Sequence, residues 1–182
     1  MRPFLLTLTF ILALASAHAE VVRLAPEFTF PGLENKAQSL KSVRGQPVVL
    51  LIAKSPKTRQ FKAQVKFLRE IFQQFANKRV LFVAAFTEES GPVVSDIPFV
   101  IANNGPGVAH SYGIVDSVNQ SPGATGFLRR AVATARGERE PFNIVIIGND
   151  GNVDYQTDQV LPAERVRDVI QNSYALQSTT GR

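Results

Sequence analysis

Cysteine is absent from the 182-residue chain, and the only methionine is Met1. Without a thiol, the chain cannot form a disulfide, cycle between thiol and disulfide, or hold a haem or metal through a thiolate. Histidine is scarce as well, with two residues in the chain, which excludes a polyhistidine metal site. The sequence therefore predicts no metal and no cofactor. His18 lies in the N-terminal segment that we expect to be cleaved, so a Ser-His-Asp triad is possible only with His110 as the base.

The excess of positive charge is too small to suggest a polyanionic partner such as nucleic acid. The net charge of the chain is +5, and it falls to +4 if residues 1–19, which contain Arg2 and no acidic residue, are removed. This balance is too small to indicate nucleic acid binding by itself. The hydrophobic content of 45% and charged content of 19% are those of an ordinary globular protein.

Residues 1–19 have the pattern of a cleavable signal peptide. Arg2 precedes an apolar run, residues 4–15, and Ala17-His18-Ala19 supplies a small-x-small cleavage pattern. The run is shorter than the roughly 20 residues that a membrane-spanning helix needs. We expect a secreted protein of the periplasm that begins at Glu20 and has no transmembrane segment after cleavage; an uncleaved anchor is the alternative.

The remaining sequence is expected to form one α/β domain, residues 20–176, followed by a frayed tail, residues 177–182. Continuous apolar runs predict buried strands at 46–53, 80–86 and 142–147. Shorter extended segments are expected at 28–30, 37–40, 97–102 and 153–156, the last after a hairpin turn at 149–152. Helices are expected at 56–76, at 107–112 and from Pro162 onward.

The helix expected at 56–76 is strongly amphipathic. At 100° per residue, six apolar side chains fall on one side: Phe61, Val65, Leu68, Ile71, Phe72 and Phe75. Four basic side chains fall within a narrow arc on the opposite side: Arg59, Lys62, Lys66 and Arg69. A buried strand before this helix and another after it predict a parallel crossover.

Five segments in this order resemble the thioredoxin-like superfamily, and specifically its redoxin branch of peroxiredoxins and secreted thiol-disulfide oxidoreductases. Residues 25–31 resemble A-P-x-F-x-L, and 40–50 resemble L-x-x-x-x-G-K-P-V-V-L. Residues 97–100 and 108–114 resemble F-P-V-L and V-A-x-x-Y-G-V, and 146–153 resemble I-D-x-D-G-x-V. The resemblance covers nearly all of residues 20–176 and implies a thioredoxin-like fold: a central mixed sheet flanked by helices, with an N-terminal redoxin-type extension.

The active-site loop departs from the family pattern. The oxidoreductase C-x-x-C would fall on Lys57-Thr58-Arg59-Gln60, and the peroxidatic cysteine of P-x-x-x-T-x-x-C on Phe61, so that Thr58 alone is retained. A helix N-terminus stabilises a thiolate there, and this chain keeps the helix start without the nucleophile. Lys57 or Thr58 would need an activating base or desolvation to replace it, and no carboxylate or histidine lies nearby in sequence.

Pro141 is the other landmark that the resemblance implies. It directly precedes the strand expected at 142–147, where the superfamily carries a cis-proline facing the active-site loop. The resemblance therefore implies a cis Glu140–Pro141 bond, and it makes Glu140, Pro141 and Phe142 candidates for binding an extended partner chain.

Residues 115–140 form an insertion where the family has only a few residues. Residues 127–135 have the pattern of a short amphipathic helix, with Arg129 and Arg130 on its polar side. Because the insertion leads directly to Pro141, it either covers the former active site or binds a partner. The alternative is a tolerated surface insertion, since long loops cost little free energy.

The basic residues of the helix also allow two interpretations. These basic residues could bind an anionic ligand or surface, or they could belong to an ordinary solvated helix face: Arg59, Lys62, Lys66 and Arg69, with Lys54 and Lys57 at the helix start. Cations near a helix N-terminus oppose its dipole, which mildly favours a role for them.

Three functions therefore remain open. The first is a binding or accessory protein with no catalytic residues, whose partner is a protein or an anionic ligand. The second is a redoxin-type enzyme that uses chemistry other than a thiol, although no other side chain cycles with peroxide as a thiolate does. The third is a structural subunit that docks on a membrane complex through the insertion.

Overall fold

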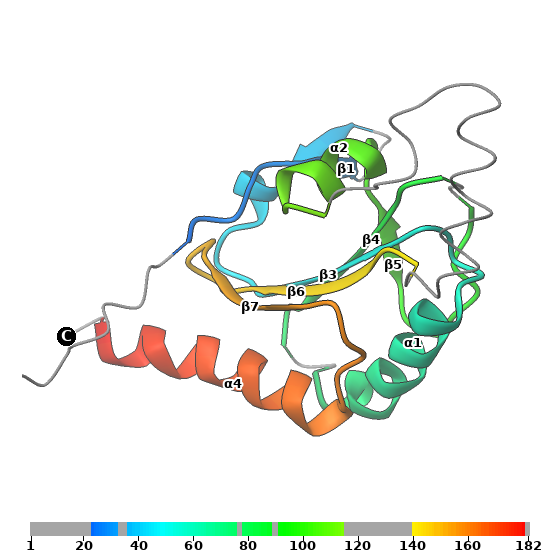
Figure 1. The fold of residues 1–182 in the computed structure, drawn as a ribbon. Helices are drawn as coiled ribbons and strands as arrows, with labels where there is room; N and C mark the ends of the chain where they lie inside the picture. The colour runs from blue at the N-terminus through cyan, green and yellow to red at the C-terminus, as the bar shows by residue number, and fades with distance from the viewer. Residues whose placement is uncertain (1–22, 33–35, 76–77, 89–90, 115–139, 181–182) are drawn as a thin grey trace, which may run out of the picture.

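The computed structural model describes residues 23–32, 36–75, 78–88, 91–114 and 140–180. The predicted signal peptide and residues 115–139 of the predicted insertion, with Arg129 and Arg130, lie outside the described residues. The described chain is built on a five-stranded sheet with helices on both faces (Figure 1). This is the α/β architecture that the apolar runs predict.

The sheet is mixed, with strand order β5-β4-β3-β6-β7. Strands β3 (Val48–Ala53), β4 (Leu81–Phe86) and β5 (Phe99–Ile101) are parallel, whereas β6 (Phe142–Ile147) and β7 (Val153–Thr157) run antiparallel to their neighbours. Every residue of β3 is buried, because β3 lies at the centre and both sheet faces are covered. The pairing of β3 with β4 confirms the predicted parallel crossover.

Helices α1 (Arg59–Phe72) and α4 (Ala163–Thr180) cover one face of the sheet (Figure 1). They enclose an apolar cluster with alternate residues of β3, β4 and β6. The predicted apolar side of α1 is confirmed, since Phe61, Val65, Leu68 and Ile71 are buried. The short 3-10 helix η3 (Gln73–Phe75) extends α1 and buries Phe75.

The opposite face is covered by α2 (Gly105–Ser111) and by the N-terminal extension, which forms the hairpin of β1 (Thr29–Pro31) and β2 (Ala37–Ser39) and the 3-10 helix η2 (Leu40–Val43) (Figure 1). Tyr112 fixes this layer, because its hydroxyl donates a hydrogen bond to the carbonyl of Pro26, 3.1 Å away. Burial raises the pKa of the Tyr112 phenol well above its ordinary value.

Two helices begin at different residues than predicted. α1 begins at Arg59 and not at Pro56, because Ser55 to Thr58 form a turn in which the Lys57 amide donates to Ser55 Oγ at 3.2 Å. α2 begins at Gly105, two residues before the predicted start, because the Asn104 side chain accepts from the Gly107 amide at 3.0 Å. α4 continues to Thr180, beyond the residue at which we expected fraying.

The predicted cis Glu140–Pro141 bond is wrong, since no peptide bond in the described residues is cis. The expectation came from family resemblance, with no local residue that requires it. A trans X–Pro bond is the more stable isomer by about 0.5–1 kcal/mol, and it leads directly into β6 here.

Candidate functional site

The loop before α1 occupies the end of the sheet at which the redoxin pattern places its nucleophile. Ala53, the last residue of β3, lies opposite Phe86 of β4 and Phe142 of β6. The chain then turns through Ser55 to Thr58 into α1. Thr58 Oγ1 donates to the Ser55 carbonyl at 3.2 Å, and the Thr58 amide donates to the same oxygen at 3.3 Å. The loop is therefore a closed, internally bonded turn.

The predicted active-site residues differ in exposure. Lys57 and Arg59 are exposed, Gln60 is half-buried, and Thr58 is 92% buried as the N-cap residue of α1. The Thr58 hydroxyl donates its hydrogen bond to the backbone carbonyl of Ser55. The hydrogen is therefore not held by a side chain that could act as a base. A hydroxyl in this state is a poor nucleophile.

Phe61, which takes the position of the peroxidatic cysteine, belongs to the core. Its side chain is 1% exposed. Its ring lies 5.2 Å from that of Phe86 in an edge-to-face arrangement and 6.0 Å from that of Phe99, distances at which aromatic pairs attract. The position that must be reachable in a thiol enzyme is thus filled by an aromatic ring.

Gln64 is a buried residue that the apolar periodicity did not predict. Its side chain is fully buried and makes two hydrogen bonds to Leu161, with Nε2 donating to the carbonyl at 3.1 Å and Oε1 accepting from the amide at 2.7 Å. This amide pair ties α1 to the segment that leads into α4. It keeps α1 in place beneath the sheet, and with it the residues described next.

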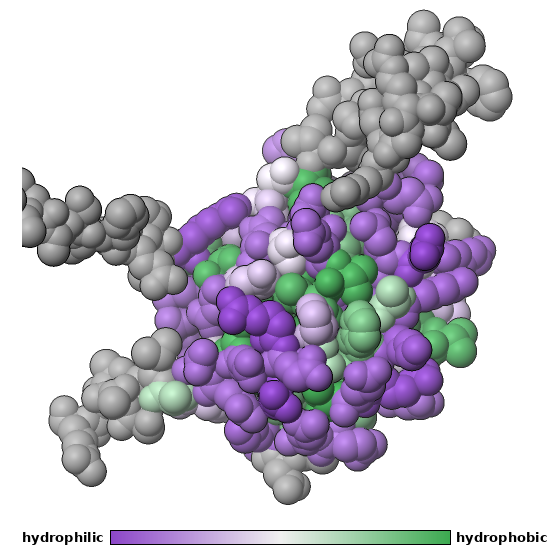
Figure 2. Space-filling model, turned by 60° about the horizontal axis from the view of Figure 1, so that its bottom comes forward, coloured by the Kyte–Doolittle hydropathy of each residue, from purple (hydrophilic) through white to green (hydrophobic). Residues whose placement is uncertain are grey.

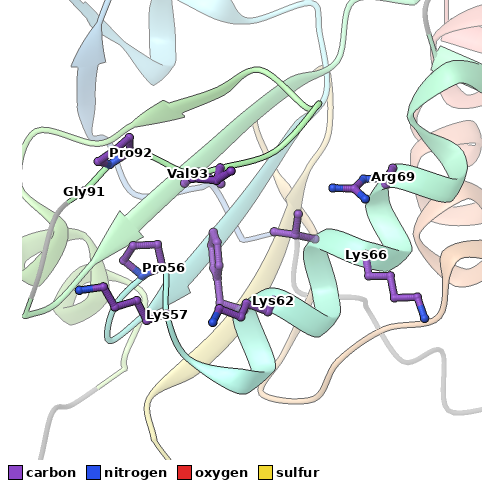
Figure 3. A pocket seen from close by; sticks show the side chains of 11 residues that line it. Pro56, Lys57, Lys62, Lys66, Arg69, Gly91, Pro92 and Val93 are labelled. Atoms are coloured by element: carbon purple, nitrogen blue, oxygen red, sulfur yellow. The ribbon is translucent and has the colours of Figure 1, made fainter.

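A pocket of about 660 Å³ lies along one flank of α1, across from the segment 91–94 that follows β4 (Figure 3). Its apolar lining consists of Pro56, Phe61, Val65, Pro92, Val93 and Val94. Its basic lining consists of Lys57, Lys62, Lys66 and Arg69. None of the described residues that line it is acidic. We call this pocket the α1 groove.

Exposed cations follow one another along the α1 groove. Figure 3 shows Lys62, Lys66 and Arg69 in succession along α1, opposite Pro92 and Val93. Arg69 pairs with Asp96, with 3.1 Å between Nε and Oδ2, but both side chains are more than half exposed. Lys62 and Lys66 form no ion pair with any residue that the structure describes. An anionic ligand could therefore bind Lys62 and Lys66 without displacing an acidic side chain of the described residues.

Apolar surface accompanies these cations. Val94 is 94% exposed and Val93 is half-buried. Figure 2 views the molecule from the side of α1 and α4, where hydrophobic residues gather in the middle of a largely hydrophilic face. Exposed apolar surface with a polar border is typical of binding sites.

The residues predicted around Pro141 divide between the core and the surface. Phe142 is 3% exposed and packs in the same cluster as Phe61, whereas Glu140 is exposed and Pro141 is half-buried. None of these three lines the α1 groove. Of the predicted binding candidates, the structure therefore brings together Lys62 and Lys66, and it separates them from the Pro141 loop.

The opposite wall of the α1 groove was not predicted. Segment 91–94 has no regular secondary structure, and the pair of valines after Gly91-Pro92 was the only sequence signal for it. Among the described residues, no three acidic or histidine side chains cluster to hold a metal ion. Nor does any helix among them have the length and apolar character needed to cross a bilayer.

Comparison with known proteins identifies the fold. No protein-family model and no curated protein sequence matches the chain. Solved structures do match, among them a thiol:disulfide interchange protein DsbE from Chlorobium tepidum, with a TM-score of 0.54, 16% identity, and 84% of this chain and 96% of that chain covered. Peroxidoxin BcpB from Mycobacterium tuberculosis has a TM-score of 0.53 and 16% identity, with 85% and 96% covered.

Thioredoxin peroxidase I from Plasmodium yoelii also matches, with a TM-score of 0.56, 15% identity, and 86% of this chain and 90% of that chain covered. The chain thus has the thioredoxin-like fold of redoxins, as its motifs predict, and it has this fold without a cysteine.

Proposed function

We propose that this thioredoxin-like chain is a binding or accessory protein that has no catalytic residues. The observation that carries the proposal is Phe61, whose ring closes the position at which the redoxin pattern places its thiolate. Beside it, the chain offers the α1 groove, which has an apolar floor and two lysines, Lys62 and Lys66, that form no ion pair among the described residues, and these features suit ligand binding.

Catalysis through another nucleophile is less well supported. The Thr58 hydroxyl is buried and donates to a carbonyl. Among the described residues, no carboxylate or histidine lines the adjoining groove, so the activating base that such a nucleophile requires is missing there.

The protein is expected to show no thiol-type activity. Because no side chain other than a thiolate cycles readily with a disulfide or hydroperoxide, reduction of insulin disulfides by dithiothreitol and consumption of hydrogen peroxide should proceed at the rates of the protein-free reactions. The measurement is turbidity for insulin and peroxide concentration for the peroxidase assay. A rate that rises in proportion to the concentration of this protein would refute the proposal.

We also propose that the protein is secreted into the periplasm. The apolar run of residues 4–15 and the Ala17-His18-Ala19 pattern support this location. Protein isolated from the producing cells should have lost residues 1–19, and its intact mass should match a chain that begins at Glu20. Recovery of the full-length chain from the cytoplasm would contradict the proposed location and would leave the binding proposal as it stands.

A further inference from the structure

We infer that the α1 groove binds an extended peptide segment in which apolar and acidic side chains alternate. This inference rests on the proposed binding function and names the chemistry of the ligand. It comes from three features of the groove: its apolar floor, the spacing of its cations, and the unpaired backbone of its outer wall.

The floor selects apolar side chains. Phe61 and Val65 belong to the core cluster and also line the groove, where they form its fixed apolar backing and leave little area open to water, since they are 1% and 7% exposed. Val93 packs against the same cluster from the other wall, and Val94 is almost fully exposed beside it. Covering this surface removes apolar area from water, which is favourable by about 25 cal/mol per Å².

The spacing of the cations selects a ligand with several separated negative charges. An α-helix rises about 1.5 Å per residue, so Lys62 and Lys66 are about 6 Å apart along α1, and Arg69 follows about 4.5 Å further on. Side chains on one face of an extended chain repeat about every 6.6–6.8 Å. Acidic residues at alternate positions of a strand therefore come close to matching the lysine spacing, and the residues between them face the floor.

A single-headed amphiphile fits this row less well. A fatty acid carries one carboxylate, which could pair closely with one of the two lysines, Lys62 and Lys66, that have no ion pair among the described residues, and would leave the other lysine unmatched. The distribution of basic side chains over about two turns of α1 therefore favours an anionic chain over an anionic headgroup.

The outer wall provides backbone groups for such a chain. Val93 and Val94 make no backbone hydrogen bond to any other described residue. Backbone N–H and C=O groups that have no partner in the protein and are accessible to solvent can form hydrogen bonds with an added extended chain. Sheet edges bind peptides in this way. The ligand would then lie between segment 91–94 and α1.

The test uses the purified protein and a fluorescent octapeptide of four Val-Glu repeats, with binding followed by fluorescence anisotropy at low salt. Three other probes are compared with it: four Val-Lys repeats, a peptide with four valines followed by four glutamates, and sodium laurate by calorimetry. We expect the Val-Glu repeat to bind at least tenfold more tightly than the Val-Lys repeat and severalfold more tightly than the block peptide. Its binding should weaken as salt rises.

Two double variants then locate the site. Lys62→Gln/Lys66→Gln removes both lysines and keeps good helix formers, and it should weaken binding of the Val-Glu repeat about tenfold. Lys41→Gln/Arg44→Gln removes the same charge within η2 and at its C-terminal end, on the opposite sheet face, and it should change binding less than twofold. Val94→Ser tests the apolar wall at a residue that is 94% exposed, where a substitution should change stability little, and a loss of binding affinity of about threefold is expected.

The inference is overturned if the Val-Lys repeat or the block peptide binds as tightly, if both double variants bind alike, or if no probe binds. Laurate binding with no peptide binding would also overturn it, and it would leave the groove as a site for a small amphiphile. These outcomes concern the ligand alone. Failure of the proposed function would appear separately, as turnover in the insulin or peroxide assay.

Discussion

Replacing Phe61 with alanine is expected to lower the free energy of unfolding by about 3–5 kcal/mol, the range for truncating a buried phenylalanine. The ring is 1% exposed, and it contacts the rings of Phe86 and Phe99, so its removal leaves a cavity between α1 and the sheet. A loss of this size is a large part of the stability of a typical domain. Urea unfolding followed by circular dichroism measures it.

The matched control is the next residue of the same helix. Lys62→Ala removes an exposed side chain and should change the free energy of unfolding by less than about 0.5 kcal/mol. A loss below about 1 kcal/mol for Phe61→Ala would contradict the assignment of Phe61 to the core. It would also weaken the proposed function, because the position would then be free to hold a reactive group.

The burial of Phe61 distinguishes this chain from thiol enzymes of the same fold. A reactive cysteine must be partly exposed in an electropositive setting. Here the first turn of α1 still faces the basic groove, but Phe61 is oriented into the core cluster and not toward solvent. Phe61 therefore contributes packing stability at the position where the redoxin pattern has its peroxidatic cysteine, and placing a reactive thiol there would carry that cost.

The layers of the fold could be predicted from the sequence because each depends on a local pattern. The runs that became β3, β4 and β6 are continuously apolar, as strands buried on both faces must be. The two sides of α1 follow from helical periodicity, which separated Phe61 and Val65 from Lys62 and Lys66. The motif order then predicted the thioredoxin-like fold that the solved structures confirm.

Features that depend on distant residues could not be predicted in this way. Gln64 is polar and yet fully buried, because Leu161, 97 positions later, supplies both of its hydrogen-bond partners. The groove wall at 91–94 has no periodicity, and its position is set by the parallel pairing of β4 with β5. The sequence indicated the groove's four cations as candidates for binding an anionic ligand, but not the apolar wall that lies opposite them.

Introducing a C-x-x-C pair at the start of α1 is expected to produce disulfide reduction. In the variant Lys57→Cys/Gln60→Cys, the first thiol replaces an exposed side chain before α1, and the second replaces a half-buried side chain in its first turn. A helix N-terminus and this spacing lower a thiol pKa from about 8.5 to about 7. With dithiothreitol as the reductant, insulin reduction should rise from the protein-free rate to one proportional to the variant's concentration.

The reactivity of the introduced thiol depends on two opposing quantities: its thiolate fraction, which rises as the pKa falls, and its intrinsic nucleophilicity, which falls. At pH 7 the thiolate fraction should rise from about 3% to about 50% when the pKa falls from about 8.5 to about 7. Intrinsic nucleophilicity falls as pKa falls, with a Brønsted coefficient of about 0.4–0.5, and this reduces the gain to about three- to fourfold. Alkylation by iodoacetamide should therefore be about three- to fourfold faster at pH 7 than for an ordinary exposed cysteine.

The control variant Asp168→Cys/Gln171→Cys places two exposed cysteines at the same spacing inside α4, away from a helix N-terminus. Because the chain has no cysteine of its own, every thiol signal in either variant belongs to the introduced pair. Equal activity of the two variants would mean that the start of α1 does not stabilise a thiolate. Higher activity at α1 alone would mean that the start of α1 can stabilise a thiolate, and that this site lacks only the two cysteines for disulfide chemistry.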